Sequence, residues 1–138
     1  MTQVNVEIIR SAYERMSRHG IEDALDAVAE DAVVRVAGEE TELRGPQAFA
    51  ELCAGYARAF EEFRAEPFEL IDAGNAVVAG LRIGGVAAAT GTESWARVFH
   101  VHTLLLGRTV RLETFHTRAA ALRCAAEAAD RAAHQKPT

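Results

Sequence analysis

Apolar residues recur every three or four positions across residues 4–18, where the repeat consists of Val6, Ile9, Tyr13 and Met16. This spacing is typical of an amphipathic helix with one buried face. Gly20 ends that helix, a shorter helix is predicted over residues 21–28, and residues 32–36 read as a strand. The first part of the chain therefore predicts two helices followed by a strand.

A third helix is predicted after a polar loop over residues 38–44. Gly45 and Pro46 open it, because proline suits the first helical turn, where its missing N–H is not needed. One face of this helix carries the most aromatic stretch of the chain, formed by Phe49, Leu52, Cys53, Tyr56, Phe60 and Phe63. The stretch predicts either plain core packing or the wall of a ligand pocket.

After Pro67 the apolar period shortens from helical spacing to alternation, which predicts antiparallel strands. A turn over residues 72–75 joins two of them, and a glycine-containing loop or bulge over 84–91 precedes the next. The strands are predicted at 68–71, 76–83, 92–104 and 109–116. An alanine-rich tail follows and is predicted to be helical from residue 118 to about residue 133.

This order of elements predicts an α+β domain over residues 1–117, followed by a helical tail over residues 118–138. We expect a cone-shaped, curved antiparallel sheet with the three N-terminal helices packed on its concave face. A cavity between such helices and such a sheet is a natural place for a small ligand. The tail is expected either to cover that pocket or to pack on a partner subunit.

Composition excludes several classes of protein. The chain has 138 residues, 49% of them hydrophobic, which is too apolar for a disordered protein. Its net charge of −5 argues against a nucleic-acid-binding protein, which needs basic residues to neutralise phosphates. No apolar run is long enough for a membrane span, and the start lacks the layout of a signal peptide, so a cytoplasmic protein with two reduced thiols, Cys53 and Cys124, is expected.

Three motifs, in this order and spacing, resemble a known family: HGIEDALDAVAEDAVVRV, LRGPQAFAEL and GRTVRLETFHT. Over residues 4–117 the chain is similar to the SnoaL-like branch of the nuclear transport factor 2-like superfamily. That superfamily includes ketosteroid isomerases, polyketide cyclases and limonene epoxide hydrolases. The resemblance implies the cone-shaped fold, but the same fold hosts many unrelated activities.

The resemblance implies that most carboxylates used by these enzymes are absent here. Tyr13 matches the tyrosine of ketosteroid isomerases that stabilises an oxyanion. The position of their proton-transferring aspartate falls on Val36, and that of their second oxyanion donor falls on or beside Phe99. An aspartate of limonene epoxide hydrolases corresponds to Thr114, and Glu113 has the opposite strand parity and is expected to face away from the cavity. Steroid isomerisation by the known mechanism is therefore not expected.

The last strand supplies the remaining candidate for acid–base chemistry. Alternation places Leu112, Thr114 and His116 on one face, which the resemblance implies lines the cavity. A histidine there is suited to general acid–base catalysis near neutral pH, and Tyr13 could polarise a carbonyl or phenolic oxygen opposite it. The alternative is that His116 is a polar residue at the sheet end and Tyr13 a core residue.

A pair of histidines, His100 and His102, lies on the preceding strand. If Phe99 faces inward, both histidines face the outer sheet surface, where a polar dimer interface explains them better than a metal site lacking further ligands. Arg97 shares the parity of Phe99, so it either binds an anionic group at the cavity mouth or is solvated.

Together these patterns predict a protein that binds a small hydrophobic molecule without a cofactor or metal. It is expected to be an isomerase, cyclase or lyase that uses His116 as acid–base and Tyr13 as oxyanion donor. The alternative is a non-catalytic ligand-binding or protein-interaction domain of the same fold. A homodimer through the outer sheet face is expected, and the predicted pocket residues are Met16, Val36, Cys53, Tyr56, Phe60, Arg97, Phe99, Leu112 and Thr114.

Overall fold

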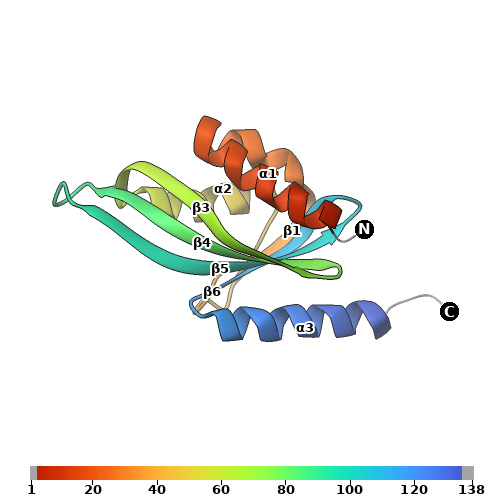
Figure 1. The fold of residues 1–138 in the computed structure, drawn as a ribbon. Helices are drawn as coiled ribbons and strands as arrows, with labels where there is room; N and C mark the ends of the chain where they lie inside the picture. The colour runs from red at the N-terminus through yellow and green to blue at the C-terminus, as the bar shows by residue number, and fades with distance from the viewer. Residues whose placement is uncertain (1–2, 135–138) are drawn as a thin grey trace.

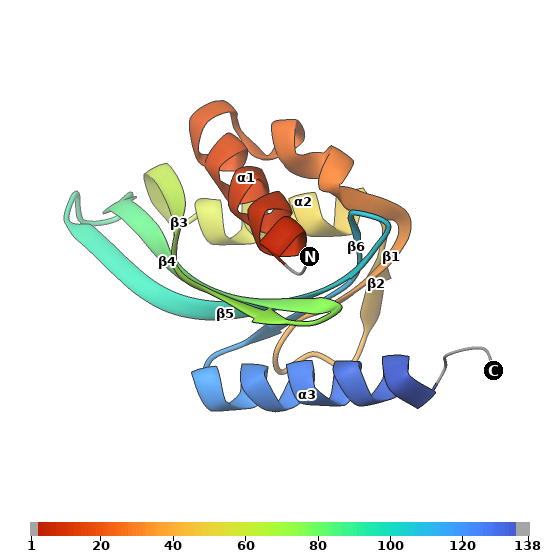
Figure 2. The same cartoon turned by 45° about the vertical axis from the view of Figure 1, so that its right-hand side comes forward.

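The computed structural model describes residues 3–134, and helices lie on both faces of its single curved sheet (Figures 1 and 2). In chain order the elements are α1 (Gln3–His19), the 3-10 helix η1 (Ile21–Ala27), β1 (Val28–Arg35), β2 (Glu42–Arg44), α2 (Pro46–Ala57), β3 (Phe60–Ala73), β4 (Ala76–Ala87), β5 (Glu93–Leu105), β6 (Arg108–Phe115) and α3 (Arg118–His134). The predicted α+β class is confirmed. None of the helices within these residues is long and apolar enough to cross a membrane.

The sheet has six strands in the order β2-β1-β6-β5-β4-β3. Neighbouring strands are antiparallel, apart from β1 and β6, which run parallel. The predicted curved sheet is therefore antiparallel except at this pair, where α2 and the strands β3 to β5 carry the chain around before β6 returns beside β1. Pro67 lies in β3 at the sheet edge, where a missing N–H is tolerated.

The third helix is shorter than the aromatic stripe predicted. It ends at Ala57, and Phe60 and Phe63 belong to the first part of β3. An irregularity in the β3–β4 register lies between Glu61 and Arg64, and Glu62 has a φ of +53°. This bulge breaks the strand alternation, so two phenylalanines three residues apart imitate helical spacing.

Two segments predicted as loops are part of the sheet. Residues Glu42–Arg44 form β2 and pair with the end of β1, with Val33 opposite Arg44. In β4, Gly84 lies opposite Trp95, and a Cβ added at Gly84 would clash with the Ser94 carbonyl oxygen. Only glycine therefore allows β4 and β5 to approach this closely, and the strand continues where a loop was predicted.

The main core fills the space between the helices and the concave face of the sheet. From α1, the stripe of Ile9, Tyr13 and Met16 is buried there, as the spacing predicts. Phe49 and Cys53 of α2 join it, opposite sheet residues that include Val77, Ala79, Leu81 and Leu112. Because these side chains fill the interior, the pockets described below lie at its margins.

A second core lies on the convex face, where α3 crosses the sheet (Figure 2). Small residues of α3 allow it to approach closely, and its buried residues include Ala121, Cys124, Ala125 and Ala128. At its start, Arg118 donates to both carboxylate oxygens of Glu69 in β3, at 2.9 and 3.1 Å. The tail thus packs on the sheet of its own chain, on part of the face where a dimer was expected.

Candidate functional site

Five polar side chains meet inside the main core, and we refer to them as the Tyr13 cluster: Tyr13 of α1, Tyr56 of α2, His100 and His102 of β5, and Thr109 of β6. The Tyr13 hydroxyl lies 2.7 Å from His100 Nδ1 and 2.7 Å from His102 Nε2. His100 Nε2 lies 3.2 Å from the Tyr56 hydroxyl, and His102 Nδ1 lies 2.9 Å from Thr109 Oγ1. One continuous chain of hydrogen bonds therefore links β6 to α2.

Alternation along β5 positions the two histidines. His100 and His102 face α1 and α2 on the concave side of the sheet, whereas Phe99 and Val101 face α3 on the convex side. The prediction that the histidines face the outer surface was therefore wrong. The physical reason is that α3 covers the outer face of the sheet, so that Phe99 and Val101 are buried against it in the second core.

Burial keeps the Tyr13 cluster uncharged at neutral pH. Desolvation lowers the pKa of both His100 and His102 to about 3, so both imidazoles are neutral near pH 7. Desolvation also raises the pKa of Tyr13 well above its ordinary value and raises that of Tyr56. Cys53 lies in the same core, where burial raises the pKa of its thiol to about 12. The cluster can therefore exchange hydrogen bonds but holds no imidazolium, and the nearby Cys53 is a neutral thiol.

Tyr56 connects this cluster to a pocket of about 270 Å³ between α2 and the end of β1, which we call the Leu52 pocket. Its rim carries the charged side chains of Glu39, Glu51 and Arg58. Its remaining lining residues are mainly apolar or small: Val36, Leu43, Leu52, Gly55 and Tyr56. Apolar walls with a few fixed polar groups are the usual makeup of a small-molecule site.

The predicted pocket residues are distributed over several places. Val36 and Tyr56 line the Leu52 pocket. Met16, Cys53 and Leu112 are buried in the main core, and Tyr13 is 1% exposed. Phe60 lies at the start of β3, with its ring 6.3 Å from that of Phe63.

Arg97 and Phe99 lie on the convex side, away from the Leu52 pocket. The Phe99 ring meets Phe68 edge-on at 5.9 Å, and the Arg97 guanidinium lies 4.8 Å above the same Phe68 ring. The expectation that Phe99 faces the inner cavity, with Arg97 able to reach the cavity mouth, was therefore wrong. Both residues share the face of β5 opposite to the one that carries His100 and His102.

The end of β6 differs from the expectation as well. The strand ends at Phe115, and His116 is exposed in the bend that follows it. Thr114 is buried, and its hydroxyl accepts a hydrogen bond of 2.9 Å from the Ala37 amide. His116 therefore does not lie opposite Tyr13, and the structure does not bring these two residues together.

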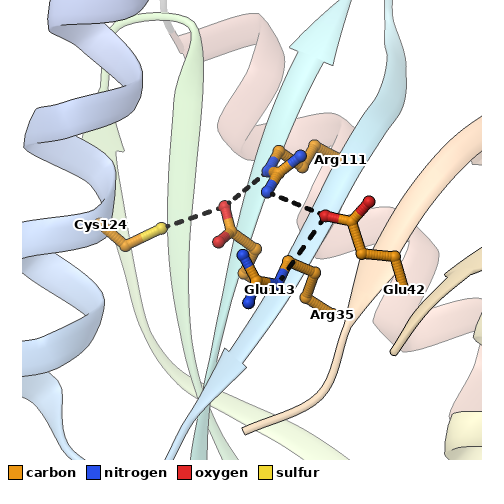
Figure 3. A network of polar contacts seen from close by, with 5 residues as sticks. All are labelled: Arg35, Glu42, Arg111, Glu113 and Cys124. Carbon is orange, nitrogen blue, oxygen red and sulfur yellow. Dashed lines mark hydrogen bonds and ion pairs between the residues drawn. The ribbon is translucent and has the colours of Figure 1, made fainter. Parts of the chain in front are cut away.

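A second polar network ties α3 to the sheet beside a pocket of about 370 Å³ (Figure 3). The thiol of Cys124 donates to the Glu113 carboxylate at 3.3 Å, and Arg111 Nε donates to the same oxygen at 2.9 Å. Arg111 also pairs with Glu42, which lies 3.9 Å from Arg35. Glu113 faces α3, which confirms that it points away from the inner core, and the whole network joins β1, β2, β6 and α3.

No group of three His, Cys, Asp or Glu residues among those described is arranged to hold a metal ion. His100 and His102 instead share the Tyr13 hydroxyl. Sequence reasoning missed the role of Thr109 and placed the histidine pair outside. The available signal was the run VFHVHTLLL, in which neither alternating face is uniformly polar.

A family model described as a SnoaL-like domain matches residues 9–112 of this chain. No curated protein matches it. Among solved structures, a nuclear transport factor 2-like protein of unknown function from Burkholderia pseudomallei is similar at 22% identity, covering 87% of this chain and 95% of that one, with a TM-score of 0.68.

Two further structures share the fold. The protein TerC, crystallised with polyporic acid, is 22% identical over 89% of this chain and 98% of its own, with a TM-score of 0.67. A putative SnoaL-like polyketide cyclase from Jannaschia is 16% identical over 89% of this chain and 91% of its own, with a TM-score of 0.70.

Proposed function

The chain belongs to the SnoaL-like domain family, and on that basis we propose that it binds a small hydrophobic molecule in the Leu52 pocket and acts on it as a cofactor-free isomerase, cyclase or lyase. The observation that carries this proposal is the position of Tyr56. Its side chain lines the pocket while its hydroxyl is held by the buried His100 at 3.2 Å. A fixed polar group beside apolar walls orients a ligand.

The proposed chemistry uses groups on both sides of this pocket. The Tyr56 hydroxyl donates a hydrogen bond to a ligand carbonyl oxygen and stabilises the negative charge that develops there. The carboxylates of Glu39 and Glu51, which line the same pocket, are the groups able to accept a proton from the carbon next to that carbonyl. The two similar structures crystallised with polyporic acid or named as a putative polyketide cyclase support a ligand of this general kind.

His116 is the competing acid–base residue. Its exposed position after β6, outside the residues that line the Leu52 pocket, favours the carboxylates instead. The low pKa values of the buried His100 and His102 favour the non-catalytic alternative, because these rings are weak proton acceptors. The bases beside the ligand are then the exposed carboxylates. In that case the pocket binds a ligand and releases it unchanged.

A ligand panel with matched variants tests the proposal. Aromatic ketones, phenols and polyporic acid are titrated against the protein, and turnover is followed by absorbance. Tyr56→Phe and Glu39→Gln or Glu51→Gln are expected to lower a measured rate by about 10²-fold or more, while His116→Ala leaves it unchanged. Binding without turnover supports the non-catalytic alternative. Absence of binding by every compound, or a 10²-fold loss in His116→Ala alone, contradicts the proposed site.

A further inference from the structure

We propose that the Tyr13 cluster is a directed hydrogen-bond chain that starts at Thr109 and ends at Tyr56, so that Tyr56 presents its O–H to the Leu52 pocket. The site then selects ligands with an oxygen that accepts hydrogen bonds, such as ketones, quinones or enolates. This inference rests on the proposed function for its ligand, but the direction of the chain is a property of the protein alone.

Thr109 sets the direction. Its side chain is buried, with the residue only 1% exposed, and within residues 3–134 its hydroxyl has one hydrogen-bond partner, His102 Nδ1. A buried hydroxyl proton without an acceptor is unfavourable, so the Thr109 hydroxyl donates to that nitrogen. A neutral imidazole carries a single N–H, and the proton of His102 must then be on Nε2.

The remaining bonds follow in sequence. His102 Nε2 donates to the Tyr13 oxygen, and the single proton of Tyr13 goes to His100 Nδ1. His100 therefore carries its own proton on Nε2, from which it donates to the Tyr56 oxygen. The proton of Tyr56 is left over, and no other described residue accepts it.

The reverse direction is possible in geometry but leaves one buried hydroxyl proton without an acceptor. If Tyr56 donated to His100, each later bond would also reverse, and His102 Nδ1–H would donate to Thr109. The Thr109 proton would then have no acceptor at a fully buried position. The usual cost of an unsatisfied buried donor makes the forward direction roughly 5- to 150-fold more populated than the reverse. Tyr56 therefore acts as a donor toward the pocket, and Thr109 is a positioning residue acting through three side chains.

Nitrogen-15 NMR of the imidazole rings tests the direction without any ligand. At pH 7 both His100 and His102 are expected as neutral rings protonated at Nε2. Thr109→Val removes the donor and is expected to move the His102 Nδ1 resonance to the position of an unbonded nitrogen. Thr103→Val is the matched control, because the buried Thr103 hydroxyl has no hydrogen-bond partner in the described chain. A proton on Nδ1 of either ring overturns the proposal.

A matched pair of ligands tests the consequence for selectivity. The ketone 1-tetralone and the hydrocarbon tetralin share one skeleton and differ in the acceptor oxygen. Wild type is expected to bind the ketone roughly 2- to 12-fold more tightly, and Tyr56→Phe to abolish that preference. Equal binding of the two by wild type overturns the selectivity while leaving the pocket intact. If neither binds, the proposed pocket fails, and the ring-proton measurement alone decides the direction of the chain.

Discussion

Replacing Tyr13 by Phe isolates the energetic role of one hydroxyl inside the core. The ring is retained, so no cavity of appreciable size forms, but two hydrogen bonds of 2.7 Å are lost. A ring nitrogen on each of His100 and His102 then has no partner. Each orphaned buried group costs about 1–3 kcal/mol, so the expected loss in the free energy of unfolding is about 2–6 kcal/mol.

Tyr56→Phe is the matched comparison, because it makes the same chemical change at the other tyrosine. It breaks one hydrogen bond of 3.2 Å at a half-buried side chain beside a pocket, where water can replace the hydroxyl. The expected loss is about 0.5–1.5 kcal/mol. At roughly 2–4 °C per kcal/mol, these values correspond to falls in Tm of roughly 4–24 °C for Tyr13→Phe and roughly 1–6 °C for Tyr56→Phe.

Thermal and urea unfolding followed by circular dichroism measure both variants against wild type. The urea dependence of the unfolding free energy is expected to stay the same, since neither change alters the surface exposed on unfolding. If Tyr13→Phe loses no more stability than Tyr56→Phe, the Tyr13 hydroxyl does not hold both histidines, and the reasoning from the Tyr13 cluster is refuted.

Further predictions concern pH and the two faces of the sheet. Since burial lowers the pKa of His100 and His102 to about 3, the unfolded chain binds protons below about pH 6.5 that the folded chain does not. Stability is therefore expected to fall as pH falls from 6.5 toward 3, by up to about 1.4 kcal/mol per pH unit for each histidine, and a urea midpoint at pH 5 that equals the one at pH 7 contradicts this. Ala121→Glu places a carboxylate at a fully buried position between α3 and the sheet, so it is expected to lower the free energy of unfolding by several kcal/mol and to increase binding of a hydrophobic dye. Ala126→Glu, at an exposed position of the same helix, is expected to change Tm little. Equal Tm values for the two variants would show that α3 does not pack as described. Gly84→Ala makes a Cβ clash with the Ser94 carbonyl oxygen of β5 and is expected to cost about 1–3 kcal/mol of stability or more, seen as a lower urea midpoint. An unchanged midpoint contradicts the close approach of β4 and β5.

The fold was predictable where one face of an element is buried and the other is wet. In α1 the stripe of Ile9, Tyr13 and Met16 gives the buried face correctly, since the opposite side of that helix is exposed. In β5 the inner face cannot be identified from the alternation of polar and apolar residues, because α3 buries the outer face as well. With apolar side chains required on both sides, polarity no longer identifies the inner face, and Phe99 and His100 were assigned to the wrong ones.

The candidate site was predictable only in part, for a related reason. Val36 and Tyr56 line the Leu52 pocket, but Met16, Cys53 and Leu112, which were predicted to share a cone-shaped pocket with them, are buried in the main core. The partners of Tyr13 were not expected, because histidines in a strand suggest a polar surface unless the acceptors and donors that satisfy them are known. The other members of the Tyr13 cluster come from α2, β5 and β6, and Thr109 in particular carries no local pattern that predicts a hydrogen bond to His102.

The most direct test of the account is an amide NMR titration of wild type with 1-tetralone. Binding at the proposed site is expected to shift the resonances of Val36, Leu52 and Tyr56 along one saturable curve, with weaker binding in Tyr56→Phe. Saturable shifts confined to residues around Cys124, in the pocket beneath α3, or no saturable shift at all, would contradict the claim that the Leu52 pocket is the ligand site.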